Sequence, residues 1–305
     1  MLNPLKNMNG KRTTTSRTGG KLPAPKGRLL AIGGKESKRR DGGGKTETQQ
    51  ENANFIGEQI LKRFASELKG RDPLVAIIPT ASTVPEELAR EYVKVFRDLG
   101  IKNIEVISIT DRRGGEDPAY CDIIRRAAGV MFTGGDQLRL TSILGGTPFM
   151  QRLKERYTHS GIIVAGTSAG ATAMSTPMIY EGETQGGIIK GDVRVTTGLE
   201  FLKNVAIDTH FIARGRIVRM AQALATNPGC VGIGLEEDTA VLVTAGREVE
   251  VIGSGLVTVV DGMRITSTDI YELENGEPFS VSGLQVHLLA NGKRYSLPTY
   301  PELHT

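Results

Sequence analysis

The segment GIIVAGTSAGATAMS, residues 161–175, indicates how this chain folds. Its apolar run, residues 162–165, stops at Gly166, and a small-residue stretch compatible with a helix follows Gly170. Between these glycines stands Ser168, in the spacing G-x-S-x-G that is typical of a turn presenting a nucleophile at the end of a sheet strand. Glycine suits such a turn because backbones approach closely there and a positive φ costs glycine little. The alternative is a small-residue crossover in which the serine has no chemical role.

Apolar runs alternate with helical periodicity before and after this turn. We expect strands at residues 28–32, 74–79, 104–109, 129–133 and 162–165, and helices at residues 52–68, 85–99, 118–128, 137–144 and 147–157. Strands that are apolar throughout and alternate with helices predict an α/β fold, with an open, mostly parallel sheet covered by helices on both faces. Beyond about residue 231 the short apolar runs predict a C-terminal antiparallel β extension of a single domain, residues 28–305.

The composition limits the classes of function. The longest apolar runs are far shorter than the ~20 residues of a membrane helix, and the N-terminus lacks the apolar stretch of a signal peptide. Cys121 and Cys230 form no disulfide framework and have no metal-ligand neighbours in the sequence. We therefore expect a cytoplasmic protein with no membrane partner and no metal site.

The net charge of +4 is located in one segment. Residues 1–27 hold six lysines and arginines and no acid, and we expect this tail to be disordered. Basic tails can contact nucleic acid. The chain lacks tryptophan and is only 5% aromatic, which gives no support for base stacking, so no nucleic-acid partner is expected.

A nucleophilic serine needs a base, and the chain offers four histidines. His159 precedes the serine strand, at the wrong end for a site that should lie at the carboxyl ends of parallel strands. His304 is in the tail, and His287 lies in a late strand. His210 follows the short apolar run 205–207 and Asp208, so it comes at the end of a strand and is the predicted base.

The base needs a carboxylate on its far ring nitrogen. The segment GIGLEEDTA, residues 232–240, places three acids after an apolar strand, and strand alternation puts Glu236 and Asp238 on one side and Glu237 on the other. Spacing alone does not choose among them. An acid of this cluster acting with His287 is a further alternative.

An oxyanion hole requires backbone N–H groups beside the serine. The turn at residues 133–137 ends the strand before the serine strand and contains Gly134 and Gly135. The N–H groups of Gly135 and Ala169 are the predicted pair.

These segments together resemble the cyanophycinase family of serine peptidases, whose wider relatives include aspartyl dipeptidases. The resemblance spans about residues 28–290 and is carried by FTGGDQLRL (132–140), GTSAGA (166–171), DTHFIARGRIVRM (208–220) and GIGLEEDTA (232–240). It implies a cofactor-free enzyme, commonly a homodimer, with a fold like the class I glutamine amidotransferase domain. The implied substrate is cyanophycin, a poly-aspartate backbone carrying arginine on each side-chain carboxyl, and the implied product is β-aspartyl-arginine.

The same resemblance assigns roles to single residues. It makes Ser168 the nucleophile, His210 the base and Glu237 the acid. It assigns substrate binding to Gln137, Asp208, Thr209, Arg214, Arg216, Arg219 and Thr226. Cationic forks suit the free carboxylates of such a substrate, and an acid suits its guanidinium.

Two positions depart from the family pattern. Thr209 stands where the family usually has glutamine, which shortens the reach of that side chain. Thr226 replaces a frequent serine and keeps the hydroxyl. The alternative functions are an α-aspartyl dipeptidase, which needs fewer cationic contacts, and a non-catalytic binding protein, which the intact serine, histidine and acid argue against.

Overall fold

The computed structural model describes residues 24–38, 55–182 and 187–298. Most of the expected basic tail and the start of the helix expected at residues 52–68 lie outside these ranges. The N–H groups of Lys26 and Gly27 donate to the carbonyls of Thr158 and Tyr157, at 3.1 and 2.8 Å. The expected boundary at residue 28 is therefore preceded by two residues that are already bound to the domain.

The main sheet has eight strands in the described part of the chain and is mostly parallel. Its five parallel strands stand in the order β1, β5, β4, β2, β3, and β12, β13 and β18 extend it antiparallel beside β1. The strands are β1 (Arg28–Ile32), β2 (Val75–Ile78), β3 (Ile104–Val106), β4 (Gly129–Phe132), β5 (Ile163–Thr167), β12 (Thr239–Thr244), β13 (Glu248–Gly253) and β18 (Arg294–Ser296). The predicted parallel sheet and part of the predicted antiparallel extension are confirmed.

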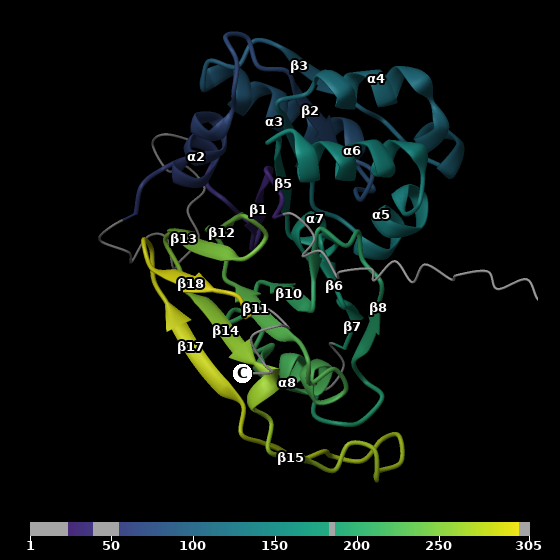
Figure 1. Cartoon of the computed structure of the whole chain (residues 1–305), viewed down its shortest axis with the longest axis vertical. Helices are drawn as coiled ribbons and strands as arrows, with labels where there is room; N and C mark the ends of the chain where they lie inside the picture. Colours follow the sequence, from purple (N-terminus) through teal and green to yellow (C-terminus); the bar gives the residue numbers. More distant parts are fainter. Residues whose placement is uncertain (1–23, 39–54, 183–186, 299–305) are drawn as a thin grey trace, which may run out of the picture.

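Helices cover both faces of this sheet because its strands are buried on both sides. In β1, Leu30 and Ile32 face a core with helices α2 and α3, while Leu29 and Ala31 face the core shared with α4, α5 and α6. Figure 1 shows these helices gathered at the upper end of the molecule. Their bounds are α2 (Gln59–Glu67), α3 (Pro85–Asp98), α4 (Pro118–Arg126), α5 (Gln137–Leu144) and α6 (Pro148–His159).

The second half of the chain builds a separate six-stranded sheet, which the sequence did not predict. Its order is β17, β14, β11, β10, β6, β9, and β10 and β11 are parallel. The strands are β6 (Ser175–Thr176), β9 (Leu202–Lys203), β10 (Val205–Thr209), β11 (Val231–Leu235), β14 (Val257–Asp261) and β17 (Gln285–Leu289). The expected C-terminal extension of one sheet is thus divided between two sheets, because β12 pairs with β1 and β13 whereas β11 pairs with β10 and β14, and the apolar residues of β11, β12 and β14 share one core.

The two sheets meet at the serine turn. Helix α7 (Ala169–Thr172) follows β5 and packs against both β5 and β10, and helix α8 (Ile217–Ala225) covers the far side of the second sheet. Figure 1 shows α7 in the middle of the molecule, above β10. The remaining elements are β7 (Met178–Glu181), β8 (Arg194–Thr196), β15 (Ser267–Thr268), β16 (Val281–Ser282) and the short 3₁₀ turns Arg112–Glu116 and Gly262–Arg264.

Candidate active site

The serine turn has the geometry of a nucleophile elbow. Ser168 sits between β5 and α7 with φ 50° and ψ −116°, a conformation that non-glycine residues rarely adopt. The flanking glycines permit the close approach of the backbone. A Cβ on Gly166 would lie 2.5 Å from the carbonyl oxygen of Gly170, and one on Gly170 would lie 2.7 Å from that of Phe132. This strained backbone conformation places the Ser168 hydroxyl at the end of the sheet.

His210 meets this serine from the other sheet. It follows β10, is mostly buried, and places Nε2 3.2 Å from Oγ of Ser168. Its own backbone is also left-handed, with φ 51°, and its N–H points to the carbonyl of Gly33 at 3.3 Å. The predicted base and nucleophile are thus in hydrogen-bond contact.

The structure distinguishes the three acids that follow β11. Oε1 of Glu237 lies 2.7 Å from Nδ1 of His210. Glu236 instead accepts N–H groups of Ile212 and Ala213, at 2.6 and 3.0 Å, so it holds the loop after the histidine. Asp238, with φ 48°, accepts the N–H of Ser37 at 2.8 Å. Among the three, Glu237 is the acid in contact with the imidazole.

The charge state of Glu237 suits an orienting carboxylate. Burial raises the pKa of this group, but hydrogen bonds from Lys35 and His210 outweigh burial and hold the pKa below its ordinary value. An ionised carboxylate at this position can accept an Nδ1–H of the imidazole, and in that tautomer Nε2 is able to accept the Ser168 hydroxyl proton.

The two predicted N–H donors of the oxyanion hole belong to residues that follow neighbouring strands. Ala169 is the first residue of α7, and Gly135 belongs to the exposed turn after β4. A Cβ built on Gly134 would lie 3.5 Å from Cβ of Ser168, so this turn borders the nucleophile. The turn is held by the Asp136 N–H, which donates to the carbonyl of Ala81 at 2.9 Å.

Three of the predicted binding residues bind one another. The fully buried Asp208 accepts Arg216 at 3.0 Å and Arg219 at 2.9 and 2.6 Å, and both arginines are also buried. Arg216 donates in addition to the carbonyl of Thr209, at 2.7 Å. Asp208 was expected to receive a substrate guanidinium, yet here two guanidinium groups of the chain itself occupy its carboxylate. These three residues lie close together because α8 folds back beside β10.

The other predicted binding residues are dispersed. The Gln137 amide, at the start of α5, donates to the carbonyl of Ile179 at 3.2 Å, and the Thr209 side chain is buried. Arg214 is exposed in the loop before α8. Thr226 is exposed at the opposite end of α8, where its hydroxyl donates to the carbonyl of Ala223 at 3.0 Å. Thr226 therefore lies at the end of α8 away from His210, whereas the Arg214 N–H donates to the carbonyl of His210 at 3.1 Å, so Arg214 lies close to the histidine.

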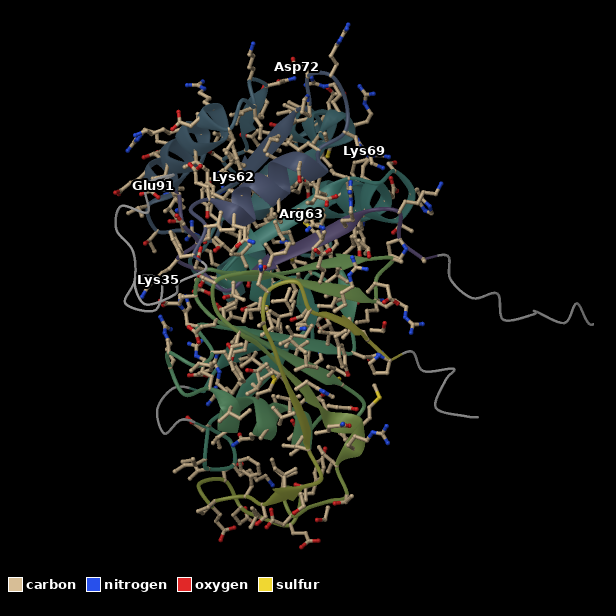
Figure 2. All side chains as sticks on the ribbon, turned by 90° about the vertical axis from the view of Figure 1, so that its left-hand side faces the viewer. Lys35, Lys62, Arg63, Lys69, Asp72 and Glu91 are labelled. Carbon is tan, nitrogen blue, oxygen red and sulfur yellow. The ribbon has the colours of Figure 1, made fainter. Side chains whose placement is uncertain are left out.

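Sequence reasoning missed the loop after β1, which borders the serine and histidine. It assigned no role to the residues that follow the strand expected at 28–32, although β1 is the parallel neighbour of β5 and its end must lie beside Ser168. A Cβ on Gly34 (φ 102°) would lie 2.6 Å from Cε1 of His210. Lys35 Nζ lies 2.8 Å from Glu237 Oε1, and Figure 2 shows Lys35 on the surface of the molecule, below Glu91. The Gly33-Gly34 pair at the strand end was the available signal.

We expect Gly34→Ala to slow phosphonylation of Ser168 by a fluorophosphonate by about 100-fold or more, because the new methyl group must displace the imidazole. Gly100→Ala is the matched control. Gly100 also has a positive φ, 89°, but a Cβ there meets no atom within 4 Å, so both variants share the backbone cost of about 1–2 kcal/mol and only one disturbs His210. Equal labelling rates for the two variants would contradict the assigned contact.

In the part of the chain that the structure describes, no group of three or more His, Cys, Asp or Glu side chains is placed to hold a metal ion. In the same part of the chain, no helix is both long enough and apolar enough to cross a bilayer.

Comparison with known proteins identifies relatives along most of the chain. A cyanophycinase from Geminocystis herdmanii is 36% identical over 244 residues, covering 80% of this chain and 90% of the relative. A cyanophycinase from Synechococcus elongatus is 33% identical over 279 residues, covering 92% and 82%. The crystal structure of a peptidase from an acI-B1 actinobacterium superposes with a TM-score of 0.60 at 19% identity, over 90% of this chain and 99% of that one, which shows a shared fold.

The sequence profile of Peptidase family S51 matches residues 42–252, a range that contains Ser168, His210 and Glu237. With a match to more than half of its length and relatives above 30% identity, this chain belongs to peptidase family S51.

Proposed function

We propose that this peptidase hydrolyses cyanophycin from a chain end and releases β-aspartyl-arginine dipeptides through an acyl-enzyme on Ser168. What supports the chemistry is one continuous chain of contacts, from Oγ of Ser168 to Nε2 of His210 at 3.2 Å and from Nδ1 to Oε1 of Glu237 at 2.7 Å. What supports the substrate is that the two relatives named above are cyanophycinases. They favour cyanophycin over the α-aspartyl dipeptides of the alternative function.

In the proposed mechanism the Ser168 hydroxyl attacks the carbonyl carbon of a backbone aspartyl bond. His210 Nε2 takes the hydroxyl proton and later gives it to the leaving amine, while Glu237 stabilises the imidazolium. The Gly135 and Ala169 N–H groups bind the oxyanion. Water then attacks the ester, His210 again acts as base, and the acyl fragment leaves with Ser168 restored. The dipeptide is the acyl fragment when the amino end of the backbone is cleaved, and it is the amine fragment when the carboxyl end is cleaved.

The arginines have two different roles in this proposal. Arg214 is exposed beside the histidine, where a guanidinium can bind a carboxylate of the substrate through paired hydrogen bonds. Arg216 and Arg219 instead form buried ion pairs with Asp208, and these pairs hold α8 against β10. Gln137, Thr209 and Thr226 remain proposed substrate-binding residues.

The proposal also covers the oligomeric state, the location, the cofactor requirement and the fold type of the enzyme. It includes a homodimer in the cytoplasm that needs no cofactor, and a fold of the class I glutamine amidotransferase type. The mass in solution, measured by light scattering, tests the dimer directly.

Ser168→Ala should lower kcat for release of the dipeptide from cyanophycin by at least about 10⁴-fold, since the other members of a triad cannot act without the nucleophile. Ser160→Ala is the control, because it removes an exposed hydroxyl at the other end of β5. Dipeptide release is measured by mass spectrometry. Undiminished release by Ser168→Ala would exclude the serine mechanism, and cleavage of α-aspartyl dipeptides but not of cyanophycin would favour the alternative substrate.

Replacement of the arginines should separate binding from stability. Arg214→Ala should raise KM about 10- to 150-fold, the loss of one charge-assisted hydrogen bond of about 1.5–3 kcal/mol, with little change in unfolding. Arg219→Ala should lower the free energy of unfolding by about 3–5 kcal/mol, because it removes two charge-assisted hydrogen bonds to the buried Asp208 carboxylate, each worth about 1.5–3 kcal/mol, and leaves Arg216 as the remaining partner. Steady-state kinetics and urea denaturation measure the two effects. An unchanged KM in Arg214→Ala would remove it from the binding site.

A further inference from the structure

The loop that follows β1 carries charged side chains that the proposed mechanism does not use. Gly34 and Lys35 both have positive φ, 102° and 47°, and for lysine this conformation is uncommon. Residues held in such conformations cluster at functional sites, where surrounding contacts fix them. Lys35 stands three residues after the end of β1, the strand beside β5.

Lys35 and His210 bind the same atom. Nζ of Lys35 lies 2.8 Å from Oε1 of Glu237, and Nδ1 of His210 lies 2.7 Å from that oxygen. The two nitrogen atoms are therefore no more than about 5.5 Å apart. At this separation a lysine cation opposes protonation of the imidazole, and it also draws electron density from the carboxylate that stabilises the imidazolium.

An ion pair with a lysine that is 60% exposed is ordinarily weak, because two mobile side chains must be ordered in water. Here the backbone on both sides of Lys35 is bound in place. The Gly34 carbonyl accepts the Asp238 N–H at 2.8 Å, and the Ser37 N–H donates to the Asp238 carboxylate at 2.8 Å. Both bonds tie the loop to the residue that follows Glu237.

The buried Glu36 fixes the same loop to the nucleophile. One of its oxygens accepts the Thr167 hydroxyl at 2.7 Å, and the other accepts the Tyr92 hydroxyl. Thr167 directly precedes Ser168, so a single residue joins the loop of Lys35, the elbow and helix α3. The position of Lys35 is thus set by contacts with the segments that carry the nucleophile and the acid.

We propose that Lys35 is a positioning residue of the triad, whose ammonium group shares the Glu237 carboxylate with His210 and so keeps His210 in its neutral, proton-accepting form at lower pH. This inference rests on the proposed function, because it assumes that His210 acts as the base. Hydrogen bonds from Lys35 and His210 also hold the pKa of Glu237 below its ordinary value, against the effect of burial.

Other charged groups face the histidine and the acid from the loops after β1, β10 and β11 and from α8. They are Glu36, Asp208, Arg214, Arg216, Arg219, Glu236 and Asp238. Asp208 is balanced by two arginines, and Glu236 is held by backbone N–H groups. These groups are the same in every variant below, so a difference between variants reports the charge at the substituted lysine.

The test compares Lys35→Met with Lys35→Arg and Lys38→Met. Lys38 is in the same loop, but its ammonium lies 3.0 Å from Glu91 and 4.4 Å from the centre of the Tyr92 ring, so Lys38→Met removes the same charge without touching Glu237. Two rates are measured against pH at low ionic strength: kcat/KM for dipeptide release from cyanophycin, and phosphonylation of Ser168 by a fluorophosphonate, which needs no cyanophycin. Thermal melting checks that each variant is folded.

We expect Lys35→Met to move the acid limb of both profiles to higher pH. Two unit charges about 5 Å apart in water change a proton affinity about fourfold, and a lower local dielectric increases this factor. Lys35→Arg should restore the wild-type limb, and Lys38→Met should leave it in place. Coincident limbs for Lys35→Met and wild type, or equal movement with Lys38→Met, would overturn the inference. If phosphonylation moves as expected while wild type does not cleave cyanophycin, the proposed substrate fails and the role of Lys35 stands.

Discussion

The hydrogen bond between Ser168 and His210 joins two sheets that the chain builds separately. The serine ends β5 of the main sheet and the histidine ends β10 of the second sheet, so a 3.2 Å contact between them requires that the sheets be fixed relative to each other. A shared apolar core, which includes Val164 of β5 and Ile207 of β10, supplies that constraint. Ser168 and His210 also have positive φ angles. These conformations cost of order 1–3 kcal/mol each and persist only because the surrounding contacts fix them.

Charge is distributed so that the two carboxylates near the histidine have different environments. Asp208 is fully buried and neutralised by Arg216 and Arg219, which makes it a fixed part of the contact between α8 and β10. Glu237 is partly exposed and contacts His210 and Lys35, two groups at the edge of the site. Removing a buried charge from water is costly without close partners, whereas a carboxylate at the surface can serve the imidazole at lower cost. This difference explains why the acid after β11, and not the one before His210, faces the ring.

The sequence predicted what depends on local pattern. Apolar strands alternating with helices predicted the parallel sheet, and the G-x-S-x-G spacing predicted the turn at Ser168. The pairing of β11 with β10 could not be predicted, because a short apolar strand fits the edge of either sheet. Alternation could not choose among the acids, since β11 ends at Leu235 and the turn that carries the acids includes Asp238 with φ 48°. The Asp208–Arg219 pair and the Lys35–Glu237 contact depend on how α8 and the loop after β1 fold back, which is a tertiary property. The roles given to the site residues stay predictions.

The most direct test of the central claim is to identify the residue that carries the acyl group. Wild-type enzyme and cyanophycin are mixed under single-turnover conditions, quenched in acid within milliseconds to seconds, and digested for peptide mapping by mass spectrometry. An acyl-enzyme mechanism predicts an aspartyl ester on the peptide that contains Ser168, which forms and then decays within the turnover, and whose acyl group, dipeptide or shortened polymer, identifies the chain end that is cleaved. Release of dipeptide with no adduct on Ser168 at any time, or an adduct on another residue, would contradict the acyl-enzyme mechanism.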